Sequence, residues 1–200
     1  MTRVKAHRAI VLILVTAGLL LAVPGGAAAH VKAKYRGEYK AKLIAWQNSF
    51  AIYEKRFLDT RGQSNTLAAT MATEMEDPDK RAQLEAHRQY ALAVYNNTKS
   101  LPATWQATIY PALKADLRKA NRWFASSRDR ASFTSQTLRV KGGFTSVTNA
   151  NDEAIVSFMW LGRNPPDLVQ QAEAIDTGDY QLASGEEVFD DALAALKKLL

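Results

Sequence analysis

Histidine, cysteine and clustered carboxylates are the side chains that most often build metal and catalytic centres, and this chain has few of them. It has no cysteine and three histidines, of which only His30 and His87 lie beyond the first 29 residues. Neither belongs to a Glu-x-x-His or His-Glu-x-x-His pattern, the spacings that place metal ligands on one helix face. The serine nucleophile motif Gly-x-Ser-x-Gly is also absent. The sequence therefore favours a protein without catalytic activity, and leaves open an enzyme without a known motif.

His30 gains a distinct chemistry if the chain is cut directly before it. Cleavage after Ala29 would leave a free α-amine beside the imidazole ring. These two nitrogens can chelate copper, a metal that imidazole suits. His30 is therefore a candidate metal ligand, although nothing in the sequence predicts a resident cofactor.

Three basic residues have a spacing that could bind an anion. Lys114, Arg118 and Arg122 are four residues apart, so a continuous helix would stack them on one face. Like charges at this spacing destabilise a helix by about 0.2–0.5 kcal/mol per pair. The face could simply be solvated, or it could pair with acidic residues of the last helix such as Glu187 and Asp190. The third interpretation is a site for an external anion.

The distribution of charge along the chain separates a basic part from an acidic part. Residues 30–148 carry 20 basic and 10 acidic side chains, whereas residues 149–200 carry 3 basic and 10 acidic ones. Such asymmetry arises when the two parts complement each other inside the fold, or when a basic surface receives an anionic partner. We expect no nucleic acid partner for an exported protein, so an anionic cell-wall polymer or anionic lipid is the partner to consider.

The first 29 residues have the three parts of a secretory signal peptide. Basic residues precede an almost entirely apolar run over residues 10–23, and Ala27 and Ala29 form an Ala-x-Ala cleavage pattern. The run of about 14 residues is shorter than the roughly 20 that span a bilayer. We therefore expect cleavage after Ala29, a location outside the cell or in its envelope, and no transmembrane helix in the product. A membrane anchor formed by an uncleaved signal is the alternative.

Beyond the signal, the pattern of apolar residues is helical throughout. Tyr39, Leu43, Trp46, Phe50 and Phe57 repeat at intervals of three, four or seven, which is typical of a helix buried in a bundle. Glycine and proline residues, single or in pairs, are expected to divide the rest of the chain into shorter helices. We predict an all-α fold in which residues 30–200 form a single domain of about six or seven helices. The expected helices are 32–60, 64–76, 79–99, a fourth from 101 that ends at Gly142-Gly143 with a kink at Pro111, 151–161, 165–177 and 184–200.

These features together predict an exported, non-enzymatic helical bundle that binds a partner of unknown identity through its surface. One alternative is an enzyme that holds an anionic substrate between helices with arginine and lysine. The other is a helical metal-binding protein that uses His30.

The expected cleavage site can be tested directly by mass. Intact-mass analysis of the protein recovered from culture supernatant or from the cell envelope should give a chain that begins at His30, because the Ala-x-Ala pattern ends at Ala29. A chain that retains Met1 in a membrane fraction would instead indicate a signal anchor.

Overall fold

The computed structural model describes residues 30–200, and the expected signal peptide lies outside the described residues. Within this range the chain forms helices joined by short turns and no strand, which confirms the all-α prediction. None of the described helices combines the length and apolar character needed to cross a membrane. In chain order the elements are the 3-10 turn η1 (Ala33–Tyr35), α1 (Arg36–Met75), the 3-10 turn η2 (Pro78–Lys80), α2 (Arg81–Thr98), α3 (Leu101–Leu117), α4 (Ala120–Trp123), α5 (Ser127–Leu161) and α6 (Leu168–Lys197).

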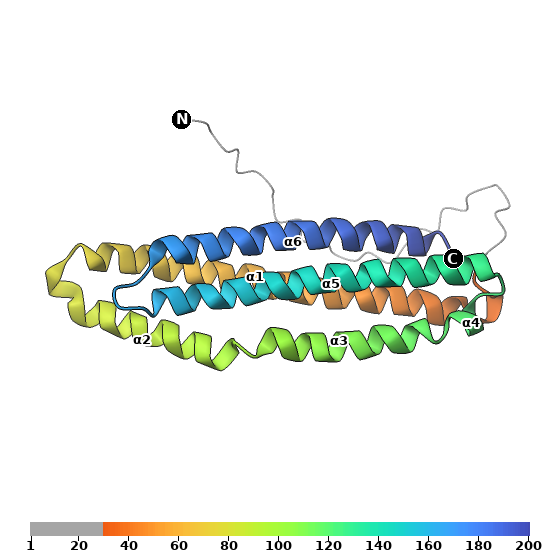
Figure 1. Ribbon diagram of the computed structural model, residues 1–200, viewed down its shortest axis with the longest axis horizontal. Helices are drawn as coiled ribbons and strands as arrows, with labels where there is room; N and C mark the ends of the chain where they lie inside the picture. Colours follow the sequence, from red (N-terminus) through yellow and green to blue (C-terminus); the bar gives the residue numbers. More distant parts are fainter. Residues whose placement is uncertain (1–29) are drawn as a thin grey trace, which may run out of the picture.

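These helices make four long, roughly antiparallel rods (Figure 1). Helices α1, α5 and α6 are one rod each, and α2 and α3 lie end to end as the fourth. With 40 residues, α1 is about 60 Å long at 1.5 Å per residue. Helix α5 contacts all three other rods, and its contact with α6 is the most extensive in the bundle. The expected count of six or seven separate helices is not confirmed, because several expected ends lie inside the rods.

The predicted aromatic stripe of the first helix lies in the core. Trp46, Phe50 and Phe57 are all buried in α1. The Phe50 ring stacks on Phe189 of α6 with a centroid distance of 4.2 Å. Toward the end of the bundle where α1 begins, a second group of rings packs edge to face, formed by Tyr39, Trp123, Phe124 and Phe133. The 3.6-residue periodicity therefore identified the correct face of α1.

Three expected helix ends at glycine are wrong. Gly62 lies inside α1, Gly142-Gly143 inside α5, and Gly178 inside α6. The expected start of the last helix at Ser184 is wrong for the same reason, since Ser184 lies within α6. The expected end before Pro78 is confirmed: α1 stops at Met75, and the Asp77 carboxylate accepts a hydrogen bond from the Asp79 N–H at 3.0 Å.

Close approach of two helices explains why Gly143 stands inside α5. A Cβ at Gly143 would lie 2.8 Å from the Cβ of Phe189 and 3.0 Å from the carbonyl oxygen of Gly185. A Cβ at Gly185 would meet Ser146 and the Gly143 carbonyl at 2.9 and 3.1 Å. The two glycines therefore let the backbones of α5 and α6 touch, a use of glycine that does not interrupt a helix.

The described chain begins with a strap, residues 30–32, that closes one end of the bundle. Val31 is buried, and its N–H donates to the Leu199 carbonyl at 3.0 Å. The Lys32 N–H donates to the Trp123 carbonyl at 2.9 Å, and Val31 forms an isolated antiparallel bridge with Phe124. The strap thus ties the start of the described chain both to its far end and to the segment between α4 and α5.

Neighbouring glycines of α5 provide a matched test of the helix contact. Gly143→Ala should destabilise the fold by about 1–3 kcal/mol, because its methyl group overlaps α6. Gly142→Ala should stabilise it by about 0.5–1 kcal/mol, because that position is exposed and its Cβ meets only Val188 at 3.8 Å. Urea unfolding measures both free energies, and equal effects of the two substitutions would contradict the close contact.

Candidate anion-binding groove

The structure separates the three basic residues that were expected to share one helix face. Helix α3 ends at Leu117 and α4 begins at Ala120, so the helix is interrupted between Lys114 and Arg122. Neither glycine nor proline marks this interruption, which is why the sequence did not predict it. Lys114 and Arg118 line a groove beside α5, whereas Arg122 turns toward α1.

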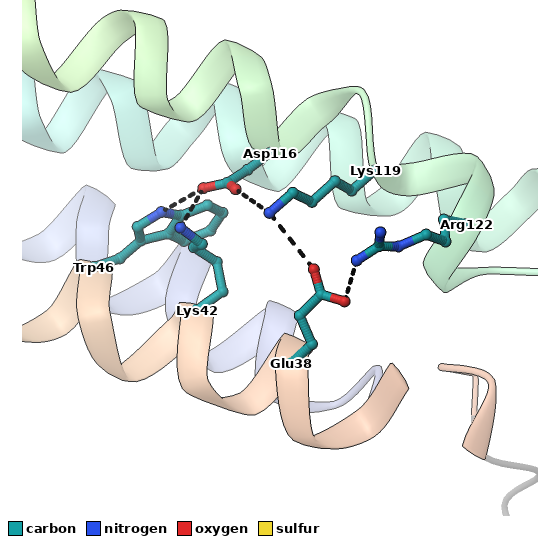
Figure 2. A network of polar contacts seen from close by, with 6 residues as sticks. All are labelled: Glu38, Lys42, Trp46, Asp116, Lys119 and Arg122. Atoms are coloured by element: carbon teal, nitrogen blue, oxygen red, sulfur yellow. Dashed lines mark hydrogen bonds and ion pairs between the residues drawn. The ribbon is translucent and has the colours of Figure 1, made fainter. Parts of the chain in front are cut away.

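Arg122 belongs to a network of polar contacts that links α1 with α3 and α4 (Figure 2). It forms an ion pair with Glu38, and its guanidinium lies 5.1 Å from the ring centre of Tyr35. Lys119 contacts the other oxygen of Glu38 at 3.5 Å. Burial alone would raise the pKa of Glu38, but the hydrogen bond from Arg122 and the two positive charges outweigh it and lower that pKa. Arg122 therefore has a structural partner of its own.

Asp116 is the buried centre of this network. Its side chain is 3% exposed and accepts a hydrogen bond from the indole N–H of Trp46 at 3.2 Å. The ammonium groups of Lys42 and Lys119 lie 3.1 and 3.5 Å from its two oxygens. Since a buried carboxylate is tolerated only with partners, these three donors explain its position in α3 (Figure 2).

The predicted pairing of the basic residues with the last helix is wrong. Among residues 30–200, no ion pair joins Lys114, Arg118 or Arg122 to α6, which lies on the opposite side of the bundle from α3 (Figure 1). Acidic residues of α6 pair instead with other arginines, Asp179 with Arg61 of α1 at 3.0 Å and Asp191 with Arg139 of α5 at 3.2 Å. Burial raises the pKa of Glu186, and the nearby carboxylates of Glu54 and Asp190 raise it further.

The groove between α3 and α5 consists of two adjoining hollows that share the side chains of Leu117 and Leu138. Their volumes are about 570 and 490 Å³. All the charged side chains that line them are cationic, namely Lys114, Arg118, Arg130 and Lys141. In the described structure none of these four is within ion-pair distance of a carboxylate, in contrast to Arg122 and Lys119.

The first hollow, which we call the arginine half, contains Arg118 and Arg130. One terminal nitrogen of Arg130 donates to the carbonyls of Ala125 and Phe124 at 2.7 and 3.4 Å. These contacts fix the guanidinium against the turn that precedes α5 and leave its remaining N–H groups available. Two guanidinium groups in one hollow are suited to bidentate recognition of a carboxylate or phosphate.

The second hollow, which we call the leucine half, is mainly apolar. Leu113, Leu117 and Leu138 line it, and Leu138 is 56% exposed. Lys141 lies over the ring of Tyr110 at 4.5 Å, and the Tyr110 hydroxyl is within 2.8 Å of the Thr145 hydroxyl. The groove therefore offers an apolar floor with positive charge at its sides.

The sequence identified only two of the four groove cations. Arg130 and Lys141 belong to α5 and reach the groove because α5 packs against α3. One signal was present: Arg130, Thr134, Leu138 and Lys141 follow a 4-4-3 spacing, which places them along one face of a helix. This spacing lies entirely before Gly142, so the expected helix end there did not hide it. The sequence does not show, however, that this face of α5 packs beside Lys114 and Arg118.

His30 lies at the same end of the bundle as the arginine half. Its Nδ1 donates to an Asp129 oxygen at 2.8 Å, and the Asp129 N–H in turn donates to the Ser126 hydroxyl that caps α5. No group of three or more potential metal ligands gathers within residues 30–200. The copper role of His30 stays a prediction, and a copper ion on Nδ1 would first have to displace Asp129.

Comparisons with family models, curated proteins and solved structures find no match for this chain. The chemistry of the groove is therefore defined by its own side chains. They provide four cations, three leucines and no carboxylate or imidazole.

The polar network can be tested through the different burial of its two acids. Asp116→Ala should destabilise the fold by about 2–3 kcal/mol, because it leaves the Trp46 N–H and the Lys42 ammonium group without their acceptor and Lys119 with Glu38 alone. Glu38→Ala should lower the free energy of unfolding by much less, because its ion pairs are half-exposed and screened by solvent. Urea unfolding of both variants is the measurement, and a larger effect at Glu38 would show that Asp116 is not the centre of the network.

Proposed function

We propose that this chain is an exported, non-enzymatic helical-bundle protein that binds an anionic partner in the groove between α3 and α5. The observation that carries the proposal is the set of four groove cations without a carboxylate partner. Cations that line one groove without counter-charges repel one another, and an anion bound there would reduce that repulsion.

The wider charge distribution supports an anionic partner at this face. Residues 101–141, from α3 to the middle of α5, carry eight basic and two acidic side chains. Both acids are engaged internally, Asp116 with Trp46 and two lysines and Asp129 with His30. Three of the basic residues, Lys119, Arg122 and Arg139, also have carboxylate partners, which leaves five without one in the described structure. Helix α6, on the opposite side, carries seven acidic residues and one basic residue. A field of this shape would steer an anion toward the groove.

Binding is proposed rather than catalysis because of what lines the groove. An enzyme that held an anionic substrate there would need an acid, base or activated nucleophile beside the cations. The lining supplies hydroxyl groups, but those of Thr134 and Thr137 donate to carbonyls of their own helix. In the described structure no hydrogen bond joins a lining hydroxyl to Lys114 or Lys141, the side chains there that could act as a base. The signal peptide expected over residues 1–29 would deliver this binding protein to the envelope or the extracellular space, where anionic polymers and lipids are the available partners.

The proposal predicts salt-sensitive binding of a polyanion. The purified protein should bind dextran sulfate, a flexible anionic polymer, and should not bind uncharged dextran. Arg118→Glu should weaken binding somewhat more than tenfold, since a lost contact of about 1.5 kcal/mol between charged groups is slightly more than a factor of ten. Raising the ionic strength should weaken binding of the unmodified protein because salt screens exposed charges.

A matched charge reversal controls for net charge alone. Arg81→Glu makes the same change at the exposed first residue of α2, outside the groove. It should leave the affinity for dextran sulfate within about twofold. If both reversals weaken binding equally, the polymer responds to overall charge, and the groove is not the binding site.

A further inference from the structure

We propose that the natural occupant of the groove is a single-chain amphiphile with a phosphate head group. This inference rests on the proposed function and specifies the chemical class of the anionic partner. The phosphate would lie in the arginine half, and the alkyl chain would lie along the leucine half.

The arginine half fits a doubly charged head group better than a singly charged one. A phosphate monoester carries a charge of about −1.5 to −2 at neutral pH and offers three acceptor oxygens. Two guanidinium groups, Arg118 and Arg130, line this hollow without any carboxylate. Arg130 is held by the carbonyls of Ala125 and Phe124, so it is already ordered before an anion arrives. A single carboxylate would neutralise only one of the two.

The leucine half explains why a purely ionic partner is not the best fit. A polyanion that needs only positive charge would leave Leu113, Leu117 and Leu138 unused. Leu138 is a large apolar side chain that stays 56% exposed in the middle of the groove. An alkyl chain laid on these leucines would remove apolar surface from water, and the stems of Lys114 and Lys141 could cover its sides.

The two halves are placed so that one molecule can use both. They meet at Leu117 and Leu138, which line each hollow. The α5 residues of the groove run from Arg130 to Lys141, a distance of about 16 Å along the helix. Charge for a head group and apolar surface for a tail are therefore continuous along one groove.

The test compares inorganic phosphate, butyl phosphate, octyl phosphate and dodecyl phosphate by calorimetry with the purified protein, each below its micelle concentration. Affinity should rise with chain length, by about tenfold or more from butyl to octyl phosphate, because the added carbons can still lie on the leucine half. Dodecanoate should bind more weakly than dodecyl phosphate, because its head group has half the charge. Arg118→Glu should weaken the binding of every phosphate.

Leu138→Gln is the decisive variant, because its exposed position makes the substitution compatible with folding. It should remove most of the dependence on chain length and leave the affinity for butyl phosphate unchanged. Ile52→Gln, at a position of α1 that is 53% exposed and outside the groove, should change neither.

The remaining outcomes separate this inference from the proposed function. Affinities independent of chain length, with dextran sulfate still bound through Arg118, would overturn the amphiphile and leave the anion-binding function intact. Dodecanoate binding as tight as dodecyl phosphate would overturn the phosphate head group. Failure of all these ligands and of dextran sulfate to bind would overturn both proposals.

Discussion

The contact between α5 and α6 at Gly143 and Gly185 is the constraint on which the rest of the bundle depends. Because neither residue has a Cβ, the two backbones touch and Phe189 is brought over Gly143. From there the Phe189 ring stacks on Phe50 of α1. Helix α5 also contacts α2 and α3, so the positions of the other rods depend on how α5 and α6 pack. Helices α1 and α3 are joined by the polar side chains around Asp116 (Figure 2) and by the packing of Tyr53 on Trp105, with a centroid distance of 5.2 Å.

The sequence predicted the parts of the fold that depend on periodicity. The burial of Trp46 and Phe50 follows from their spacing alone, and so does the all-α class. The expected helix ends at Gly143 and Gly178 were wrong because glycine has two separate uses, whereas Gly62 has no neighbour within 4 Å of a Cβ and nothing in the structure explains it. Glycine permits a positive φ at the end of a helix, and it permits close approach inside one. Only the position of the facing helix distinguishes them, and the sequence does not show which residue faces Gly143.

The candidate site was predictable only in part, for a related reason. Lys114 and Arg118 are close in sequence and could be found by their spacing, whereas Arg130 and Lys141 join them through packing of α5 on α3. Arg122 was assigned to the same face because no residue type marks the interruption between α3 and α4. The excess of basic residues in one part of the chain and of acidic residues in the other is visible in the sequence. Which of these charges pair with one another depends on which helices are neighbours in the fold.

The strap at Val31 limits when the chain could be cleaved after Ala29 relative to folding. It is completed by the carbonyl of Leu199, at the far end of the described residues, so it can form only once the chain as far as Leu199 is in place. Val31 is buried there, only one residue beyond the expected cleavage site after Ala29. A peptidase that must bind residues on both sides of the Ala29–His30 bond could not reach Val31 once this end of the bundle has closed. Cleavage at the expected site would therefore have to precede closure of this end of the bundle.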